Sequence, residues 1–87
     1  MDKKEIKKIT RKILRNSDHG VKIPSDFPDE ASLFLSGILD SFGIFTFIQT
    51  LQKEFNLVIK NKEIHPGNFE TIEQITTFIF NKMEVGK

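Results

Sequence analysis

The feature that most restricts the fold is a run of apolar residues spaced three and four positions apart in the middle of the chain. These residues follow the i, i+3, i+4, i+7, i+11 pattern of one helix face: Ile44, Phe47, Ile48, Leu51 and Phe55. Asp40 precedes them, and its carboxylate is a suitable N-cap. We therefore predict a helix from Asp40 to about Asn56.

Two other segments have the same periodicity. Asp2 and Glu5 have the spacing of an N-cap pair, and an apolar stripe follows at Ile6, Ile9 and Ile13. Near the end of the chain, Thr71 and Gln74 match the capping-box spacing. The stripe of this last helix is Ile72, Ile75, Ile79 and Met83. The first helix is expected to stop between residues 16 and 20, where turn-forming residues gather.

The segments between these helices are expected to be irregular. A long loop from Val21 to Asp40 carries Pro24 and Pro28 and several apolar residues, so we expect it to pack against the core. After the second helix we expect an extended link and one helical turn at residues 61–64, ended by Pro66 and Gly67. No segment alternates as a strand does. The sequence predicts an all-α four-helix bundle of three longer helices and one short one, in a single domain of residues 1–87.

Composition restricts the chemistry that the chain can perform. Its 87 residues are 38% hydrophobic and 29% charged, which is typical of one globular domain. Because the sequence has no cysteine, it offers no disulfide, no zinc knuckle and no thiol of its own. The first fifteen residues are charged and lack the apolar stretch of a signal peptide or a membrane span, so we expect a cytoplasmic protein.

Ser41 is the candidate site for chemistry. It lies in the sequence Gly37-Ile38-Leu39-Asp40-Ser41-Phe42-Gly43, which joins the long loop to the first turn of the central helix. The unpaired N–H groups and the positive dipole of a helix N-terminus favour a phosphate ester. A hydrolase serine is not expected, because the G-x-S-x-G pattern is absent and neither His19 nor His65 has an evident triad partner. Both histidines are interpreted as solvent-facing or helix-end residues, and no metal site is predicted.

A second face of the central helix lies beside Ser41. On a helical wheel, it is separate from the core stripe and contains Phe42, Phe45, Thr46, Gln49 and Gln52. Exposed aromatic residues next to a modified group predict a surface that docks partners. The alternative is that Phe42 and Phe45 pack against the long loop.

The block from Leu33 to Ile79 resembles the acyl carrier protein family, especially its stand-alone peptidyl and aminoacyl members. The resemblance rests on the segment around Asp40-Ser41-Phe42, on the end of the central helix at residues 51–55, and on residues 66–72. It implies a non-enzymatic carrier that holds acyl or aminoacyl intermediates as thioesters on a 4'-phosphopantetheine arm attached to Ser41. Asp40 would cap the helix and help the metal of the modifying enzyme.

The resemblance also implies a set of partners. A phosphopantetheinyl transferase would move the arm from coenzyme A to Ser41, a ligase would load the acyl or aminoacyl group, and a downstream synthase or transferase would use it. The acidic second helix of fatty-acid carriers is replaced here by a more apolar face, which favours amino-acid or specialised acyl pathways. We expect a monomer.

The first helix supports a different interpretation. Seven Lys or Arg residues lie within residues 1–15, so an unmodified helical module could bind a partner or an anionic surface through them. No aromatic residue is interleaved and no helix-turn-helix spacing is present, so neither nucleic acid nor a stable membrane contact is expected. The simplest explanation of the basic residues is a solvated face of the first helix. For the carrier interpretation, the sequence does not identify the cargo.

Overall fold

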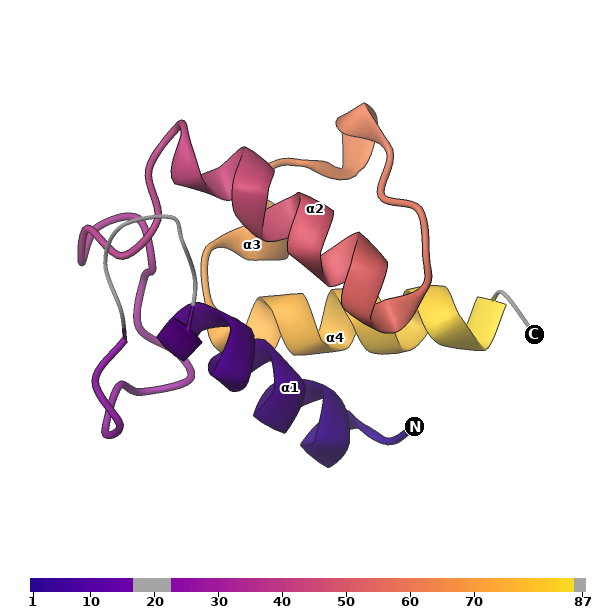
Figure 1. Ribbon diagram of the computed structural model, residues 1–87, viewed down its shortest axis with the longest axis horizontal. Helices are drawn as coiled ribbons and strands as arrows, with labels where there is room; N and C mark the ends of the chain where they lie inside the picture. Colours follow the sequence, from indigo (N-terminus) through magenta and orange to yellow (C-terminus); the bar gives the residue numbers. More distant parts are fainter. Residues whose placement is uncertain (17–22, 86–87) are drawn as a thin grey trace.

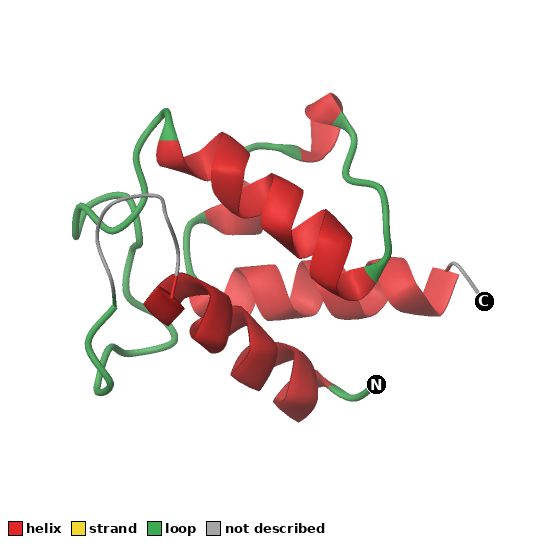
Figure 2. Cartoon of the chain, in the orientation of Figure 1, coloured by secondary structure: helices red, strands yellow, loops and turns green. Residues whose placement is uncertain are grey.

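The computed structural model describes residues 1–16 and 23–85, and in these ranges every regular element is a helix (Figures 1 and 2). The elements are α1 (Lys3–Asn16), α2 (Gly43–Phe55), the short 3-10 helix η1 (Asn61–Glu63), α3 (Pro66–Phe69) and α4 (Ile72–Val85). α1 packs on both α2 and α4, and α3 packs on α4. No helix in the described ranges is long and apolar enough to cross a membrane. The predicted all-α fold is confirmed.

The core face of α2 agrees with the sequence pattern. Its five apolar residues are all buried: Ile44, Phe47, Ile48, Leu51 and Phe55. The helix ends where Asn56 adopts a left-handed conformation with φ 52°. The N–H of Leu57 then donates to the carbonyl of Gln52 at 3.1 Å, which satisfies one of the last carbonyls of the helix.

The predicted caps of α1 and α4 are present. The N–H of Glu5 donates to Asp2 Oδ1 at 2.9 Å. At the start of α4, the N–H of Gln74 donates to Thr71 Oγ1 at 3.0 Å, and the N–H of Thr71 donates to Gln74 Oε1 at 3.3 Å. These bonds use backbone donors that a helix start leaves unpaired, so local sequence determines where both helices begin.

The buried stripe of α1 differs from the predicted one. Ile6 and Ile13 are buried, but Ile9 is only half-buried, and Thr10 and Leu14 complete the core face. The prediction considered apolar residues alone and therefore missed Thr10. Its Oγ1 is buried without a hydrogen-bond partner in the described part of the chain.

The predicted helical turn is present and ends before Pro66, but the sequence analysis did not predict the further short helix that follows it. η1 occupies the predicted turn, but Pro66 begins α3. Proline suits the first position of a helix because its missing N–H would have no intrahelical partner there. α3 is attached to α4 through Phe69, which is 1% exposed and meets the ring of Phe78 edge-on, with 5.2 Å between ring centroids.

The described part of the long loop packs against the bundle, as predicted. Its buried residues are Ile23, Phe27, Leu33, Ile38 and Leu39. Two backbone hydrogen bonds join it to the corner between α3 and α4: Leu33 N–H donates to the Glu70 carbonyl at 2.7 Å, and Glu73 N–H donates to the Asp29 carbonyl at 3.0 Å. The loop that leads into α2 is thus held in place by the segment between α3 and α4.

Candidate functional site

Asp40 organises the first turn of α2. Its Oδ1 accepts hydrogen bonds from the N–H groups of Phe42, at 3.0 Å, and Gly43, at 2.6 Å. Its backbone carbonyl accepts the first helical hydrogen bond, from Ile44 N–H at 3.0 Å. Regular helix begins at Gly43, but these bonds show that the turn containing Ser41 already belongs to the hydrogen-bonded start of the helix.

Ser41 is exposed at this turn. Its hydroxyl makes no hydrogen bond to any residue of the described ranges, in contrast to the neighbouring Asp40 carboxylate. The residues two positions before and two positions after it are anchored: Leu39 is 1% exposed, and Gly43 is buried. The backbone is therefore held in place while the hydroxyl faces solvent.

The loop that leads to Ser41 is fixed by a short network. Leu39 N–H donates to the Leu33 carbonyl at 2.9 Å, and Ser32 Oγ donates to Glu70 Oε2 at 2.9 Å. Between Leu33 and Leu39, Gly37 adopts φ 82°, a left-handed conformation that glycine reaches without a Cβ penalty. This turn directs the chain from the buried Leu33 back toward Asp40.

An exposed apolar surface surrounds the serine. Phe42 is 85% exposed and Phe45 is 60% exposed, so the alternative in which they pack against the loop is wrong. Thr46 and Gln49 are also exposed on the same face of α2. The structure thus places four of the five residues of the predicted face in solvent, beside or below Ser41 on the helix. The fifth, Gln52, is half-buried, and its Oε1 accepts a hydrogen bond from Ile59 N–H at 2.8 Å.

The structure adds Leu35 to the exposed apolar residues of this region. Its side chain is 88% exposed, although Leu33, two residues earlier, is buried. Ser32 Oγ accepts a hydrogen bond from Leu35 N–H at 3.0 Å, and this turn holds the leucine outward. Sequence reasoning missed it because Leu33, Phe34 and Leu35 form one apolar run with no periodicity to indicate which side chain faces out.

An ion-pair cluster holds α1, the loop and α4 together. Asp29 accepts from Arg11 at 2.6 Å and pairs with Lys7 at 3.0 Å, and Lys7 also contacts Glu73 at 2.8 Å. Burial alone would raise the pKa of Asp29, but hydrogen bonds from Arg11 and Lys7 outweigh it and lower the pKa below its ordinary value. The pKa of Lys7 is raised, mainly by its hydrogen bond to Glu73. The cluster stabilises the loop on which the Ser41 turn rests.

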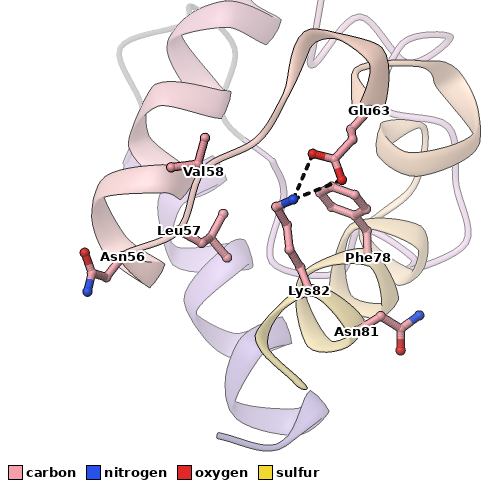
Figure 3. Close-up of a pocket in the computed structure, with 7 residues that line it drawn as sticks. All are labelled: Asn56, Leu57, Val58, Glu63, Phe78, Asn81 and Lys82. Atoms are coloured by element: carbon pink, nitrogen blue, oxygen red, sulfur yellow. Dashed lines mark hydrogen bonds and ion pairs between the residues drawn. The ribbon is translucent and has the colours of Figure 1, made fainter. Parts of the chain in front are cut away.

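A groove of about 570 Å³ lies at the other end of α2 (Figure 3). Its lining residues are Asn56, Leu57, Val58, Glu63, Phe78, Asn81 and Lys82. Lys82 Nζ donates to both carboxylate oxygens of Glu63, at 2.8 and 3.0 Å, and this hydrogen bond is the main reason that the pKa of Glu63 is lowered. Ser41 precedes α2 and Asn56 follows it, so about 20 Å of helix separates the two sites. The groove is therefore not part of the Ser41 site.

The two histidines lie away from this site in sequence. His65 is exposed and precedes α3, where its carbonyl accepts from Asn68 N–H at 2.9 Å, consistent with a helix-end residue. His19 lies outside the described residues.

Comparisons with known proteins give two informative matches. The chain is 34% identical over 50 residues to a probable acyl carrier protein, PigG, of Serratia sp. (strain ATCC 39006), and the match covers 58% of each chain. It is also similar to a chain in a crystal structure of Bradyrhizobium japonicum glycine:[carrier protein] ligase complexed with glycylated carrier protein. That match has a TM-score of 0.61 and 25% identity, over 86% of this chain and 95% of the other. The resemblance to the acyl carrier protein family is thereby confirmed.

The extent of the two matches differs. The structural match spans most of both chains. The sequence match covers little more than half of the curated carrier protein. No protein-family model matches the chain. The family is therefore supported by sequence over part of the chain and by the fold over most of it.

Proposed function

We propose that the chain carries an acyl or aminoacyl group as a thioester on a 4'-phosphopantetheine arm attached to Ser41. The observation that carries the proposal is the exposed Ser41 hydroxyl, unbonded within the described residues, in a turn that Asp40 fixes. The matches to carrier proteins support the same role. In this role the chain is a substrate of its partner enzymes and is not itself a catalyst.

The geometry fits attachment of the arm at Ser41. During transfer the Ser41 Oγ–phosphorus bond forms, the pyrophosphate bond of coenzyme A breaks with adenosine 3',5'-bisphosphate as the leaving group, and the hydroxyl proton passes to a base of the transferase. Once attached, the arm would supply the thiol that this cysteine-free chain lacks. The contribution of the chain itself is to expose the nucleophilic oxygen on a turn whose backbone is held by the hydrogen bonds to Asp40.

The first-turn N–H groups of α2 were expected to bind the phosphate of the arm, but Asp40 already accepts hydrogen bonds from two of them. Its Oδ1 already accepts two of the first-turn N–H groups, so these donors are not available to the phosphodiester. The phosphate therefore remains in solvent, and the turn serves to orient Ser41. Because Oδ1 makes both capping bonds, the other carboxylate oxygen of the exposed Asp40 is left to approach a cation of the transferase.

Partner enzymes would dock on the apolar surface beside the arm. Phe42 and Phe45 are exposed at the start of α2 next to Ser41, and phenylalanine is among the residues enriched in interfaces, where a few side chains carry most of the binding energy. The regular first turn of α2 contains no acidic residue. This composition fits partners that recognise shape and apolar area better than partners that rely on charge.

The class of the first partner follows from the structural match. The similar chain comes from a complex of a carrier protein with a ligase that loads glycine. We therefore propose an aminoacyl- or acyl-loading ligase as the enzyme that charges the arm, and a synthase or transferase as the enzyme that removes the cargo. With partners of this kind, we propose a cytoplasmic location for the protein.

Intact mass spectrometry tests the proposal. The protein is incubated with coenzyme A and a broad-specificity phosphopantetheinyl transferase, and Ser41→Ala is compared with Ser36→Ala, a second exposed serine in the same loop region. The parent and Ser36→Ala should each gain one phosphopantetheine group, and Ser41→Ala should gain none. Absence of any gain in the folded parent would favour an unmodified interaction module.

A second measurement tests the docking surface. Once a loading ligase accepts the modified protein, Phe42→Ala and Phe45→Ala should each raise KM for the carrier, whereas Val58→Ala should not. Val58 is a suitable control because it is 70% exposed and lines the groove at the far end of α2. An equal effect of all three substitutions would contradict docking beside Ser41.

A further inference from the structure

The basic first helix is not uniformly solvated, because the fold uses three of its seven cations. Lys7 and Arg11 belong to the ion-pair cluster with Asp29 and Glu73. Lys3 Nζ lies 3.5 Å from Thr77 Oγ1 and 5.5 Å from the centre of the Phe80 ring. These three side chains therefore hold α1 against the loop and α4.

The remaining four cations form one exposed stripe: Lys4, Lys8, Lys12 and Arg15. Within residues 1–16 and 23–85, none of them makes an ion pair or a side-chain hydrogen bond. They are spaced four, four and three residues apart, so their directions span about 80° around the helix and about 16 Å along it. We call these four residues the basic stripe.

Charge repulsion within the basic stripe lowers the stability of the isolated protein. Like charges one helical turn apart repel, and the stripe contains three such neighbouring pairs. Glu5 is the acidic residue of the first turn of α1, and in the described structure it forms no ion pair with the stripe. A helix face that only needed to be soluble would be more stable with mixed charges.

We propose that the basic stripe binds an acidic surface on a protein partner. Insertion into a membrane is not available to this helix, because its apolar face, Ile6, Ile13 and Leu14, is buried in the bundle. The stripe includes no aromatic residue on which a base could stack, which disfavours nucleic acid. A row of cations on a rigid convex helix instead complements a row of carboxylates on another folded protein.

This inference does not depend on Ser41, so its test is separate from that of the proposed function. The probe is a designed coiled coil that presents glutamates along its outer face, with a glutamine version as its control. Binding to the isotope-labelled protein is followed by the amide chemical shifts of α1. A triple charge reversal, K4E/K8E/K12E, removes most of the stripe.

A second triple reversal serves as the matched control. K53E/K60E/K62E reverses three exposed lysines outside α1. Either triple variant changes the net charge from +1 to −5, because each reversal adds −2. The two variants therefore differ only in where the charge lies. Thermal unfolding establishes that both remain folded.

The glutamate coiled coil should shift the α1 amides and bind at least tenfold more weakly to K4E/K8E/K12E, while K53E/K60E/K62E and Ser41→Ala lose no more than about twofold. Binding should also weaken as salt is added. Equal losses in the two triple variants would overturn the proposal, because net charge alone would explain them. Tighter binding to phosphatidylglycerol vesicles or to a short duplex DNA than to the coiled coil would also overturn it, and would reassign the stripe to that partner.

Discussion

Replacing Asp40 by alanine removes the carboxylate that accepts the Phe42 and Gly43 N–H groups at 3.0 and 2.6 Å. Loss of a side-chain N-cap costs about 1 kcal/mol, within a range of about 0.5 to 2. Because Asp40 is exposed, water can partly satisfy the freed donors, which argues against the upper end of the range. For a domain of this size the expected drop in Tm is about 4 to 8 °C.

Asp40→Asn separates the hydrogen bonds from the charge. Asparagine keeps an acceptor oxygen at the cap, so its Tm should fall by less than half as much as that of the alanine variant. Both variants are compared by thermal unfolding and by the rate of arm transfer to Ser41. The asparagine variant should keep the turn but lose the carboxylate oxygen available to a transferase cation.

Two results would refute this reasoning. If Asp40→Ala unfolds at the parental temperature, the two hydrogen bonds do not stabilise the first turn of α2. If both variants accept the arm at the parental rate while fully folded, then Asp40 neither orients Ser41 nor assists the transferase, and its role is limited to stability.

Four further substitutions test other parts of the structure. Lys8→Glu should stabilise the fold by about 1 kcal/mol in urea unfolding, because it turns the repulsion from Lys4 and from Lys12 into attraction. An unchanged or lower stability would mean that repulsion within the basic stripe does not destabilise the fold. Thr10→Val should raise stability by about 1 kcal/mol, since it removes a buried hydroxyl that has no partner in the described residues; a loss would indicate that the hydroxyl is satisfied. Phe69→Ala should cost about 3 to 5 kcal/mol, because the side chain is 1% exposed, and calorimetry showing a small loss would mean that α3 contributes little to the core. In the folded state the pKa of Glu63 is lowered from its ordinary value of 4.5, mainly by the hydrogen bond from Lys82. The stability that the Glu63 carboxylate contributes is therefore complete above pH 4.5 and is lost as the pH falls through the lower folded pKa. The Tm difference between the parent and Glu63→Gln should shrink in acid, and a difference that stays constant would contradict this role of the Glu63–Lys82 pair.

Local chemistry made much of this structure predictable. Asp2, Asp40 and Thr71 each cap a helix as their spacing indicates, because a cap is formed by residues within one turn of each other. The core stripe of α2 was equally clear, since its five residues repeat with the helical period. Both signals are contained in a few consecutive residues.

The features that were missed depend on contacts between distant segments. Thr10 is buried because α4 and α2 cover that face of α1, and composition gives no sign of it. Leu35 faces solvent because a turn stabilised by Ser32 directs it outward, although its neighbours Leu33 and Phe34 pack inward. The division of the basic helix into structural and exposed cations also required the positions of Asp29 and Glu73.

The hydrogen bonds from Leu33 to Glu70 and from Ser32 to Glu70 have a consequence for synthesis of the protein. Ser41 leaves the ribosome long before residue 70 does, so the loop before Ser41 lacks its hydrogen-bond partner Glu70 until then. The Asp40 cap can form locally, but the loop beneath it can reach its final arrangement only after residue 70 has emerged. A transferase that recognises the turn together with this packed loop would therefore act only on chains in which residue 70 has already emerged.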